Sequence, residues 1–382
     1  MKQKTSVFST LNRDVPSSIV VLFVALPLCL GIALASGAPL FSGLIAGIVG
    51  GTLVGAVSKS SHGVSGPAAG LAVIILTTLL TMPFETFLLA VVIAGIIQII
   101  LGLLRAGIIG YYFPLSAING MLAGIGIIIF IKQLPFAFGY DGEWKGPDYF
   151  NQLHDGSMFT ALLQFFEHVT AGAIILAIIS MGLLLLWELY LSKKHKIFRL
   201  VQGPIVVVAV GIICQFITKS FFPQIHLGQE YLVSVPVASG ISSFFGQFTF
   251  PDFTQIGNRE VYVLAVTIAL VASLETLLCV EATDKLDPHK RVTPTNRELF
   301  AQGTGNIVSG MIGGLAITQV SVRSSANIQA GAQSKMSTIL HGAFLLICVA
   351  FIPGILNLIP LPALACILLM VGYKLAKPAQ FA

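Results

Sequence analysis

The stretch Gly63-Val64-Ser65-Gly66-Pro67-Ala68-Ala69-Gly70 interrupts an apolar part of the sequence and is followed by the apolar run 71–80. A proline at the first helical position, after a Ser-Gly pair, is a helix start signal. The preceding apolar run ends only near Lys59, so this helix would start inside a membrane. Irregular backbone at that depth persists only where protein or a water-filled cavity satisfies its polar groups. The stretch therefore predicts a half-helix that lines a site.

A second stretch follows the same pattern in the other half of the chain. This stretch is Gly313-Gly314-Leu315-Ala316-Ile317-Thr318-Gln319-Val320-Ser321-Val322-Arg323-Ser324-Ser325. It leads into a short segment that ends near Lys335. Interrupted helices at corresponding places in two halves indicate the site of an inverted-repeat transporter. The alternative is an ordinary polar kink in each helix. The matching positions and the intramembrane arginine favour half-helices.

The composition places the whole chain in a membrane. Only 10% of its 382 residues are charged and 55% are hydrophobic, whereas soluble domains carry roughly 25% charged residues. This excludes a soluble enzyme, a nucleic-acid-binding domain and a disordered chain. The five cysteines stand singly in apolar runs without CxxC spacing. They are predicted to be buried apolar residues rather than disulfide or metal ligands.

The apolar runs predict about twelve membrane elements, because a helix needs about 20 apolar residues to cross the hydrocarbon core. Two interrupted segments lie near 64–82 and 320–335. Ten fuller runs lie at about 17–36, 40–58, 84–104, 113–131, 161–191, 203–222, 260–281, 299–316, 338–357 and 360–376. The fold class is therefore an all-α polytopic membrane protein.

Basic residues predict the orientation. With a cytoplasmic N-terminal segment 1–16, most lysines and arginines fall on the inner side, and only Lys132, Lys145, Lys219 and Arg259 fall outside. This asymmetry fits the positive-inside rule. We expect a multi-pass protein of the inner (plasma) membrane.

The two half-helices predict an anion site. Each helix N-terminus offers free N–H groups and about half a positive charge. Ser65 and Ser321 add hydroxyl donors, Arg323 adds a positive charge, and neither stretch contains an acid. Glu275 lies in the middle of another span, where a charge is costly and points to function. It either couples transport to Na⁺ or H⁺ or forms a static ion pair with Arg323.

Five ordered motifs make the chain resemble the SulP family of inorganic anion permeases over residues 12–378. In chain order they are Ala25-Leu26-Pro27-Leu28-Cys29-Leu30-Gly31-Ile32-Ala33 with Ser36-Gly37-Ala38-Pro39, Ser65-Gly66-Pro67, Ser273-Leu274-Glu275-Thr276-Leu277-Leu278, Asn296-Arg297-Glu298-Leu299 with Gln302-Gly303-Thr304-Gly305-Asn306, and the segment from Arg323 to Gly331.

The resemblance implies fourteen segments in two inverted repeats of seven. It implies a core domain from 17–104 and 259–358, and a gate domain from 105–258 and 359–382. Many members add a cytoplasmic STAS domain. We expect this chain to stop after about segment twelve and to carry no STAS domain.

The resemblance also implies site residues and partners. The anion-binding residues expected from it are Leu28, Ile32, Ser65, Gly66, Pro67, Ala68, Val320, Ser321, Val322 and Arg323. The coupling ion, Na⁺ in the bicarbonate-carrying members, would be held by Glu275, Cys279 and Ser321, although Cys279 replaces a hydroxyl and is a poorer sodium ligand. Bicarbonate is the first choice of substrate and sulfate the second. A homodimer is implied, with no other cofactor and no nucleic acid.

Three other functions share some of these sequence features. An uncoupled anion channel or exchanger, for instance for chloride, fits the same residues. A nucleobase permease of the same fold would use acids to hold neutral bases, so Arg323 and the helix N-termini argue against it. The string Gly63-Val64-Ser65-Gly66 resembles the nucleophile motif of rhomboid proteases, but the only deep histidine, His341, lies far downstream. No enzymatic activity is predicted.

Overall fold

The computed structural model describes residues 10–111, 115–139, 169–194, 198, 203–237, 243 and 245–376. These residues divide into two compact units, one from 1–121 and 235–353 and the other from 122–234 and 354–382. The expected domain boundaries were 104/105, 258/259 and 358/359, whereas the two units meet along the chain at 121/122, 234/235 and 353/354. The assignment of one unit as core and the other as gate stays a prediction.

The first unit contains most of the helices and the only two strands of the described residues. Its elements are α1 (Leu11–Ala35), α2 (Leu40–Val49), the π-helical turn η2 (Gly50–Val54), α3 (Gly55–Val57), β1 (Ser65–Pro67), α4 (Ala69–Leu79), α5 (Phe84–Leu103), η3 (Ala106–Tyr111), η7 (Phe253–Gly257), α14 (Arg259–Leu286), α15 (Thr295–Met311), β2 (Ile317–Gln319), α16 (Ser321–Gln329) and α17 (Met336–Phe351). The predicted helical fold with two half-helices is confirmed. The strands are an addition that the sequence did not predict.

The second unit is helical. It contains most of α6 (Leu115–Phe138), which begins in the first unit, and then α9 (Ala171–Leu186), η4 (Trp187–Leu191), α10 (Ser192–Lys194), α12 (Gly203–Phe221), η5 (Pro223–Ile225), η6 (Gln229–Tyr231), α18 (Pro353–Leu356) and α19 (Leu361–Leu375). Helix α9 packs against α12 and α19. A small core of Ala173, Leu176, Leu227 and Tyr231 closes the end of α9.

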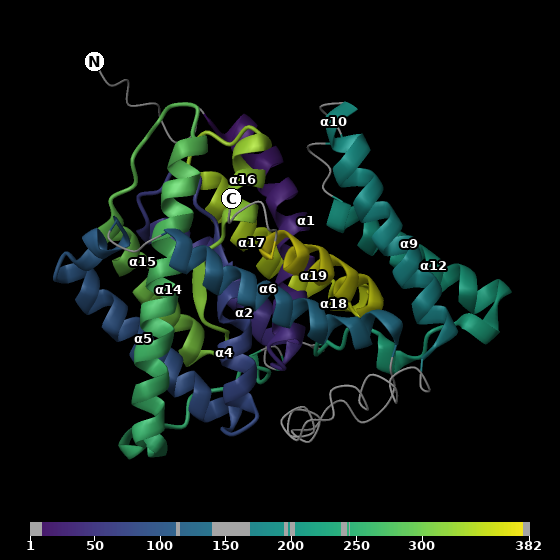
Figure 1. Ribbon diagram of the computed structural model, residues 1–382, viewed down its shortest axis with the longest axis horizontal. Coiled ribbons are helices and arrows are strands. Elements are labelled where there is room, and N and C mark those ends of the chain that lie inside the picture. Colours follow the sequence, from purple (N-terminus) through teal and green to yellow (C-terminus); the bar gives the residue numbers. More distant parts are fainter. Residues whose placement is uncertain are drawn as a thin grey trace. The chain divides into compact units, whose positions relative to one another are not determined.

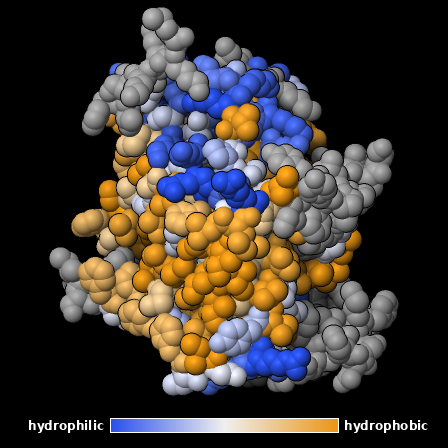
Figure 2. All heavy atoms as spheres, turned by 90° about the vertical axis from the view of Figure 1, so that its left-hand side faces the viewer, coloured by the Kyte–Doolittle hydropathy of each residue, from blue (hydrophilic) through white to orange (hydrophobic). Residues whose placement is uncertain are grey.

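The helices agree with the predicted spans. Six of those described are long and apolar enough to cross a membrane, and four shorter apolar helices accompany them. Residues 161–168 of one predicted span lie outside the described residues. Figure 2 shows an apolar zone between two hydrophilic ends on the face turned to the viewer. Large apolar side chains are also exposed on the helices of the first unit, among them Ile96 and Ile100 on α5 and Leu270 on α14.

Helices α5 and α15 lie side by side in the first unit (Figure 1) and approach closely through glycines. A Cβ placed on Gly95 would lie 2.7 Å from the Gly303 carbonyl oxygen, and one on Gly303 would lie 2.6 Å from the Gly95 oxygen. Gly102 and Gly310, seven residues further along each helix, make similar approaches to the opposite helix. Small residues are the usual way for membrane helices to pack backbone to backbone. Strand β2 packs against α15 of this pair.

Candidate functional site

The two interrupted stretches meet as a pair of antiparallel strands. Ser65 pairs with Gln319, Gly66 with Thr318, and Pro67 with Ile317. Each strand leads into a half-helix, so β1 precedes α4 and β2 precedes α16. The two half-helices therefore begin at the two ends of this short crossover.

Buried polar side chains hold β2 in place. Asn306 on α15 bonds both polar groups of the Ile317 backbone, at 2.6 Å from its N–H and 3.1 Å to its carbonyl. Asn306 also donates to Gln98 on α5 at 2.7 Å, and Gln98 donates to Ser273 on α14 at 3.3 Å. A buried backbone group without a hydrogen-bond partner is costly. Asn306 supplies partners for the Ile317 N–H and carbonyl because the two-stranded sheet is too short to do so.

Helix α14 and the start of α16 complete the support. Thr276 accepts from the Gln319 N–H at 3.2 Å, and Thr283 accepts from the Gln319 side chain at 3.1 Å. Val320 N–H donates to the Val64 carbonyl at 2.9 Å, which ties the end of one crossover strand to the beginning of the other. The strands are thus fixed from both sides.

The N-terminus of α16 is the open part of the predicted anion site. Ser321 and Val322 are exposed, Val322 by 42%, and Val320 is half-buried. The Cys279 thiol on α14 lies in hydrogen-bonding range of both the N–H and the hydroxyl of Ser321. The structure thereby brings together Glu275, Cys279 and Ser321, the three residues expected to hold a coupling ion.

The N-terminus of α4 faces a carboxylate. Gly70 N–H interacts with the side chain of Glu275, and a Cβ placed on Gly70 would lie only 2.6 Å from Glu275 Oε2. That oxygen is buried without a hydrogen-bond partner of ordinary geometry. Glu275 therefore lies close to both half-helices through Gly70 and Cys279.

Arg323 lies against Gly66 of the crossover and not beside Glu275, where the hypothesis of a static ion pair requires it to be. It is fully buried, and its guanidinium lies against Gly66, where a Cβ would collide with Nη1. Its electrostatic neighbours are Cys29 on α1 and His341 on α17. None of its nitrogens has a hydrogen-bond partner of ordinary geometry, and it forms no ion pair with Glu275. The hypothesis of a static Glu275–Arg323 pair is wrong for this structure.

The remaining predicted anion-binding residues are buried. Ser65 is 2% exposed, and its hydroxyl accepts a 2.7 Å hydrogen bond from Gln302 on α15. Gly66, Pro67 and Ala68 are buried around it. On α1, which packs against β1 and both half-helices, Leu28 and Ile32 are also buried and form part of the apolar core.

Sequence reasoning missed several residues that shape the site. It gave no role to Gln302, Asn306 or Thr276, although all three stand in quoted motifs. It also missed the π-helical turn η2, where Gly50 and Gly51 let the second helix approach the Ser65 backbone and α17. A π-turn often marks a functional place in a helix, and the Gly-Gly pair was its only sequence signal.

A charged cluster ties down the C-terminal end of α14. Asp287 accepts from Arg291 at 2.7 Å and lies 3.4 Å from His62. Burial alone would raise the pKa of Asp287, but hydrogen bonds from Arg291 and His289 outweigh it and hold the pKa below its usual range. Burial and the Arg291 charge lower the pKa of His62. Both groups are structural here.

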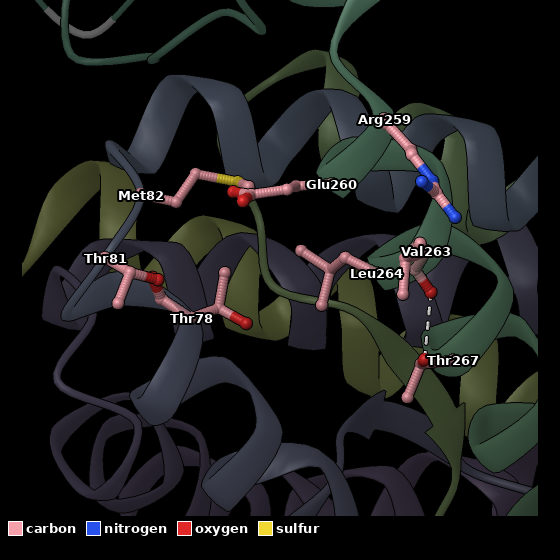
Figure 3. A pocket seen from close by; sticks show the side chains of 8 residues that line it. All are labelled: Thr78, Thr81, Met82, Arg259, Glu260, Val263, Leu264 and Thr267. Atoms are coloured by element: carbon pink, nitrogen blue, oxygen red, sulfur yellow. Dashed lines mark hydrogen bonds between the residues drawn. The ribbon is translucent and has the colours of Figure 1, made fainter.

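Two pockets flank α14 away from the crossover. One of about 390 Å³ lies between the ends of α4 and α14, where Met82 and Glu260 reach toward its middle from opposite sides (Figure 3). Another of about 300 Å³ lies near Lys285 and Thr293 at the opposite end of α14. Neither is lined by a predicted anion-binding residue. The described residues include no group of three or more His, Cys, Asp or Glu side chains that could hold a metal.

Crossed half-helices supported by α1 and α14 define a membrane transporter fold of the inverted-repeat kind. The sequence pattern of the sulfate permease family matches residues 11–382, and the chain belongs to that family. It is 25% identical over 373 residues to the putative sulfate transporter YvdB of Bacillus subtilis (strain 168), covering 97% of this chain and 66% of that protein. It is also 25% identical over 382 residues to the bicarbonate transporter BicA of Picosynechococcus sp., covering 96% of this chain and 62% of BicA.

Solved structures show the same fold. The transmembrane domain of a cyanobacterial bicarbonate transporter BicA aligns with a TM-score of 0.83 at 22% identity, over 98% of this chain and 91% of that one. SLC26A9 aligns with a TM-score of 0.78 at 18% identity, over 98% and 59%. The chain spans about two thirds of the length of the curated relatives it matches. These relatives are transporters rather than enzymes, as predicted.

Proposed function

We propose that this chain forms the membrane part of a secondary active transporter of a small inorganic anion. The observation that carries the proposal is the meeting of α4 and α16 at one crossover, with the α16 N-terminus exposed at Ser321. Helix N-termini attract anions through their free N–H groups and their dipoles. Residues 11–382 match a family whose curated relatives include sulfate and bicarbonate transporters.

The buried charge of Arg323 supports an anion rather than a neutral substrate. Its guanidinium lies against Gly66 of the crossover and, among the described residues, has no carboxylate partner. A positive charge in a poorly solvated environment acts over a longer distance than in water. A nucleobase permease of the same fold would have no use for this field.

Glu275 supports coupling to a cation. Its carboxylate lies close to both half-helices, and among the described residues its Oε2 atom has no partner of ordinary geometry. A cation or proton at Glu275, Cys279 and Ser321 would offset the repulsion between the carboxylate and an arriving anion. Na⁺ prefers oxygen ligands, and the thiol of Cys279 is a soft one. The choice between Na⁺ and H⁺ therefore stays with experiment.

The remaining expectations from the family belong to the same proposal. Bicarbonate is the first candidate substrate and sulfate the second. The protein would work as a homodimer in the plasma membrane, with its N-terminus in the cytoplasm, and would move the core past the gate. An uncoupled anion channel or exchanger, as for chloride, is the alternative mechanism.

The test is flux into proteoliposomes that contain the full chain. Labelled sulfate, bicarbonate, chloride and uracil are offered separately, with and without imposed Na⁺ and H⁺ gradients. We expect uptake of bicarbonate or sulfate that an inward cation gradient accelerates. Uptake of uracil alone would overturn the proposal. Anion flux indifferent to both gradients would favour the uncoupled alternative.

A further inference from the structure

A buried carboxylate outside the proposed anion site is connected to it by hydrogen bonds. Glu298 lies in the first turn of α15 and is 1% exposed. The Ser58 hydroxyl donates to its Oε2 atom, and the Gln302 side-chain N–H donates to its Oε1 atom at 2.9 Å. Nothing in the proposed mechanism uses this carboxylate. A buried acid is costly to keep without a role or full hydrogen bonding.

The connection continues to the crossover. The same Gln302 nitrogen donates to the Ser65 hydroxyl oxygen at 2.7 Å, and Gln302 is fully buried. An amide nitrogen has two hydrogens, so both are consumed, one by Glu298 and one by Ser65. The Gln302 carbonyl oxygen is buried without a partner.

This arrangement determines what the Ser65 hydroxyl can do. A hydroxyl oxygen that accepts from an N–H keeps its own hydrogen for another acceptor. None of the hydrogen bonds found for the described residues uses that hydrogen. The ionised Glu298 therefore leaves Ser65 as a free donor in the strand that leads into α4.

We propose that Glu298 is a positioning residue for anion recognition, which sets through Gln302 whether Ser65 can donate a hydrogen bond to the anion. The inference rests on the proposed function and on the expectation from the sequence that Ser65 contributes to the anion site. Ionised Glu298 holds the Gln302 amino group toward Ser65. Protonated Glu298 becomes a donor and turns the Gln302 carbonyl toward itself and Ser65. The Ser65 hydrogen is then taken by Gln302.

The proton in this step comes from water and stays on Glu298, and no other bond changes. Some charged groups around Glu298 oppose its ionisation and others favour it. The carboxylate of Asp284 on α14 opposes its ionisation. The α15 N-terminus favours the charged form. Lys335 donates to the Ser58 carbonyl at 3.4 Å, and Arg297 donates to the neighbouring Val57 carbonyl at 3.0 Å, so two cations lie on the Ser58 side.

The test measures binding of sulfate and chloride to the full chain in lipid nanodiscs from mildly alkaline to mildly acidic pH. Neither anion gains a proton in this range. In the wild type we expect the affinity to fall as the pH falls. At alkaline pH, Glu298→Gln should bind the anion about tenfold more weakly than the wild type, as expected for one lost hydrogen bond to a charged group. Because residue 298 no longer titrates in this variant, its anion affinity should not change over the pH range in which Glu298 takes up a proton.

Three further variants separate positioning from a purely structural role. Glu298→Asp retains a carboxylate and should retain a pH dependence. Ser65→Ala should lose the same pH step, and adding Glu298→Gln to it should change affinity little further, because both act through one hydroxyl. Glu281→Gln, which removes an exposed carboxylate that pairs with Lys285 at 2.7 Å, is the matched control and should behave as wild type.

The outcomes are distinct. If Glu298→Gln and the wild type have the same affinity and pH profile, the proposal is wrong. If Glu298→Gln does not fold, the proposal is still wrong when Ser65→Ala weakens binding but keeps the full pH dependence. A wild type that binds neither anion at any pH, or a Ser65→Ala variant with unchanged affinity, contradicts the proposed site instead.

Discussion

The backbone N–H of Gly70, at the N-terminus of α4, faces the carboxylate of Glu275 on α14. A helix N-terminus is the place where an anion is best stabilised. In this structure the carboxylate of the protein itself is held there. A substrate anion that approaches α4 must therefore share the N-terminus with Glu275, unless a cation or a proton first offsets that charge.

The first prediction tests this contact with Gly70→Ala. The new Cβ would lie 2.6 Å from Glu275 Oε2, closer than van der Waals contact allows, so the carboxylate must move away from α4. We expect anion uptake driven by a cation gradient to fall at least tenfold while the protein stays folded. The measurement is uptake into proteoliposomes, with thermal unfolding as the check on stability.

The control for this variant is Gly182→Ala in α9, where an added Cβ meets no atom within 4 Å. Alanine is the better helix former by about 1 kcal/mol, so this variant should be at least as stable and transport normally. Equal transport by both variants would mean that the Gly70–Glu275 contact has no part in coupling.

The second prediction concerns the buried charge behind the crossover. Arg323→Lys keeps a positive charge near Gly66 and should retain partial uptake. Arg323→Ala removes the field and should lose most of it. Initial uptake rates at low and saturating anion concentration separate a loss of affinity from a loss of turnover. Normal transport by Arg323→Ala would show that the arginine serves packing alone.

The two serines allow a third prediction, because the structure places them differently. Ser321 is exposed, whereas Ser65 is buried against Gln302. A lost hydrogen bond to a charged ligand costs about 1.5–3 kcal/mol, so each alanine variant should weaken anion affinity tenfold or more. Ser65→Ala should also lower the unfolding temperature, since it leaves one of the two amide hydrogens of the buried Gln302 side chain without an acceptor. If neither variant changes anion affinity, the site has been placed wrongly.

Much of the fold was predictable because local rules govern it. Long apolar runs predict spanning helices, and Pro67 and the polar stretch before Ser321 predict where the half-helices start. Helix periodicity also explains why Glu275 and Cys279, four residues apart, share one face of α14. These features need no knowledge of distant contacts.

The rest depended on contacts between distant residues. Strands of three residues are too short to show an alternating pattern, so β1 and β2 were not predicted. Asn306 and Gln302 find partners that no spacing rule reveals. The alternative hypothesis of a Glu275–Arg323 ion pair assumed that two intramembrane charges are neighbours. Two residues along a helix means a turn of about 200°, so Arg323 points away from the face that exposes Ser321.

The fourth prediction concerns stability and pH. Because the folded-state pKa of Asp287 is depressed, its contribution is complete above the unfolded pKa of about 3.9 and is lost as the pH falls below it. Asp287→Asn should therefore destabilise the protein at neutral pH, by about 1.5–3 kcal/mol for hydrogen bonds to a charged group, and flatten the acid limb of stability. Thermal unfolding across pH measures both.

Glu281→Gln is again the matched control, because its ion pair with Lys285 is exposed and worth at most about 1 kcal/mol. An Asp287→Asn variant as stable as this control at neutral pH would contradict the structural role of the cluster.

The last prediction decides between coupled and uncoupled transport. Glu275→Gln keeps the shape of the side chain and removes its charge, as protonation would. If a cation at Glu275 admits the anion, the two ligands bind cooperatively, and each must raise the affinity of the other by the same factor. We expect Glu275→Gln to abolish the dependence of uptake on a Na⁺ or H⁺ gradient, while anion exchange without a gradient persists. Uptake is measured with each gradient imposed separately, in wild type and variant.

If wild-type uptake depends on neither gradient, Glu275 does not couple anion transport to a cation. Its place at Gly70 would then make it a fixed competitor of the anion, and the variant should bind the anion more tightly than the wild type does.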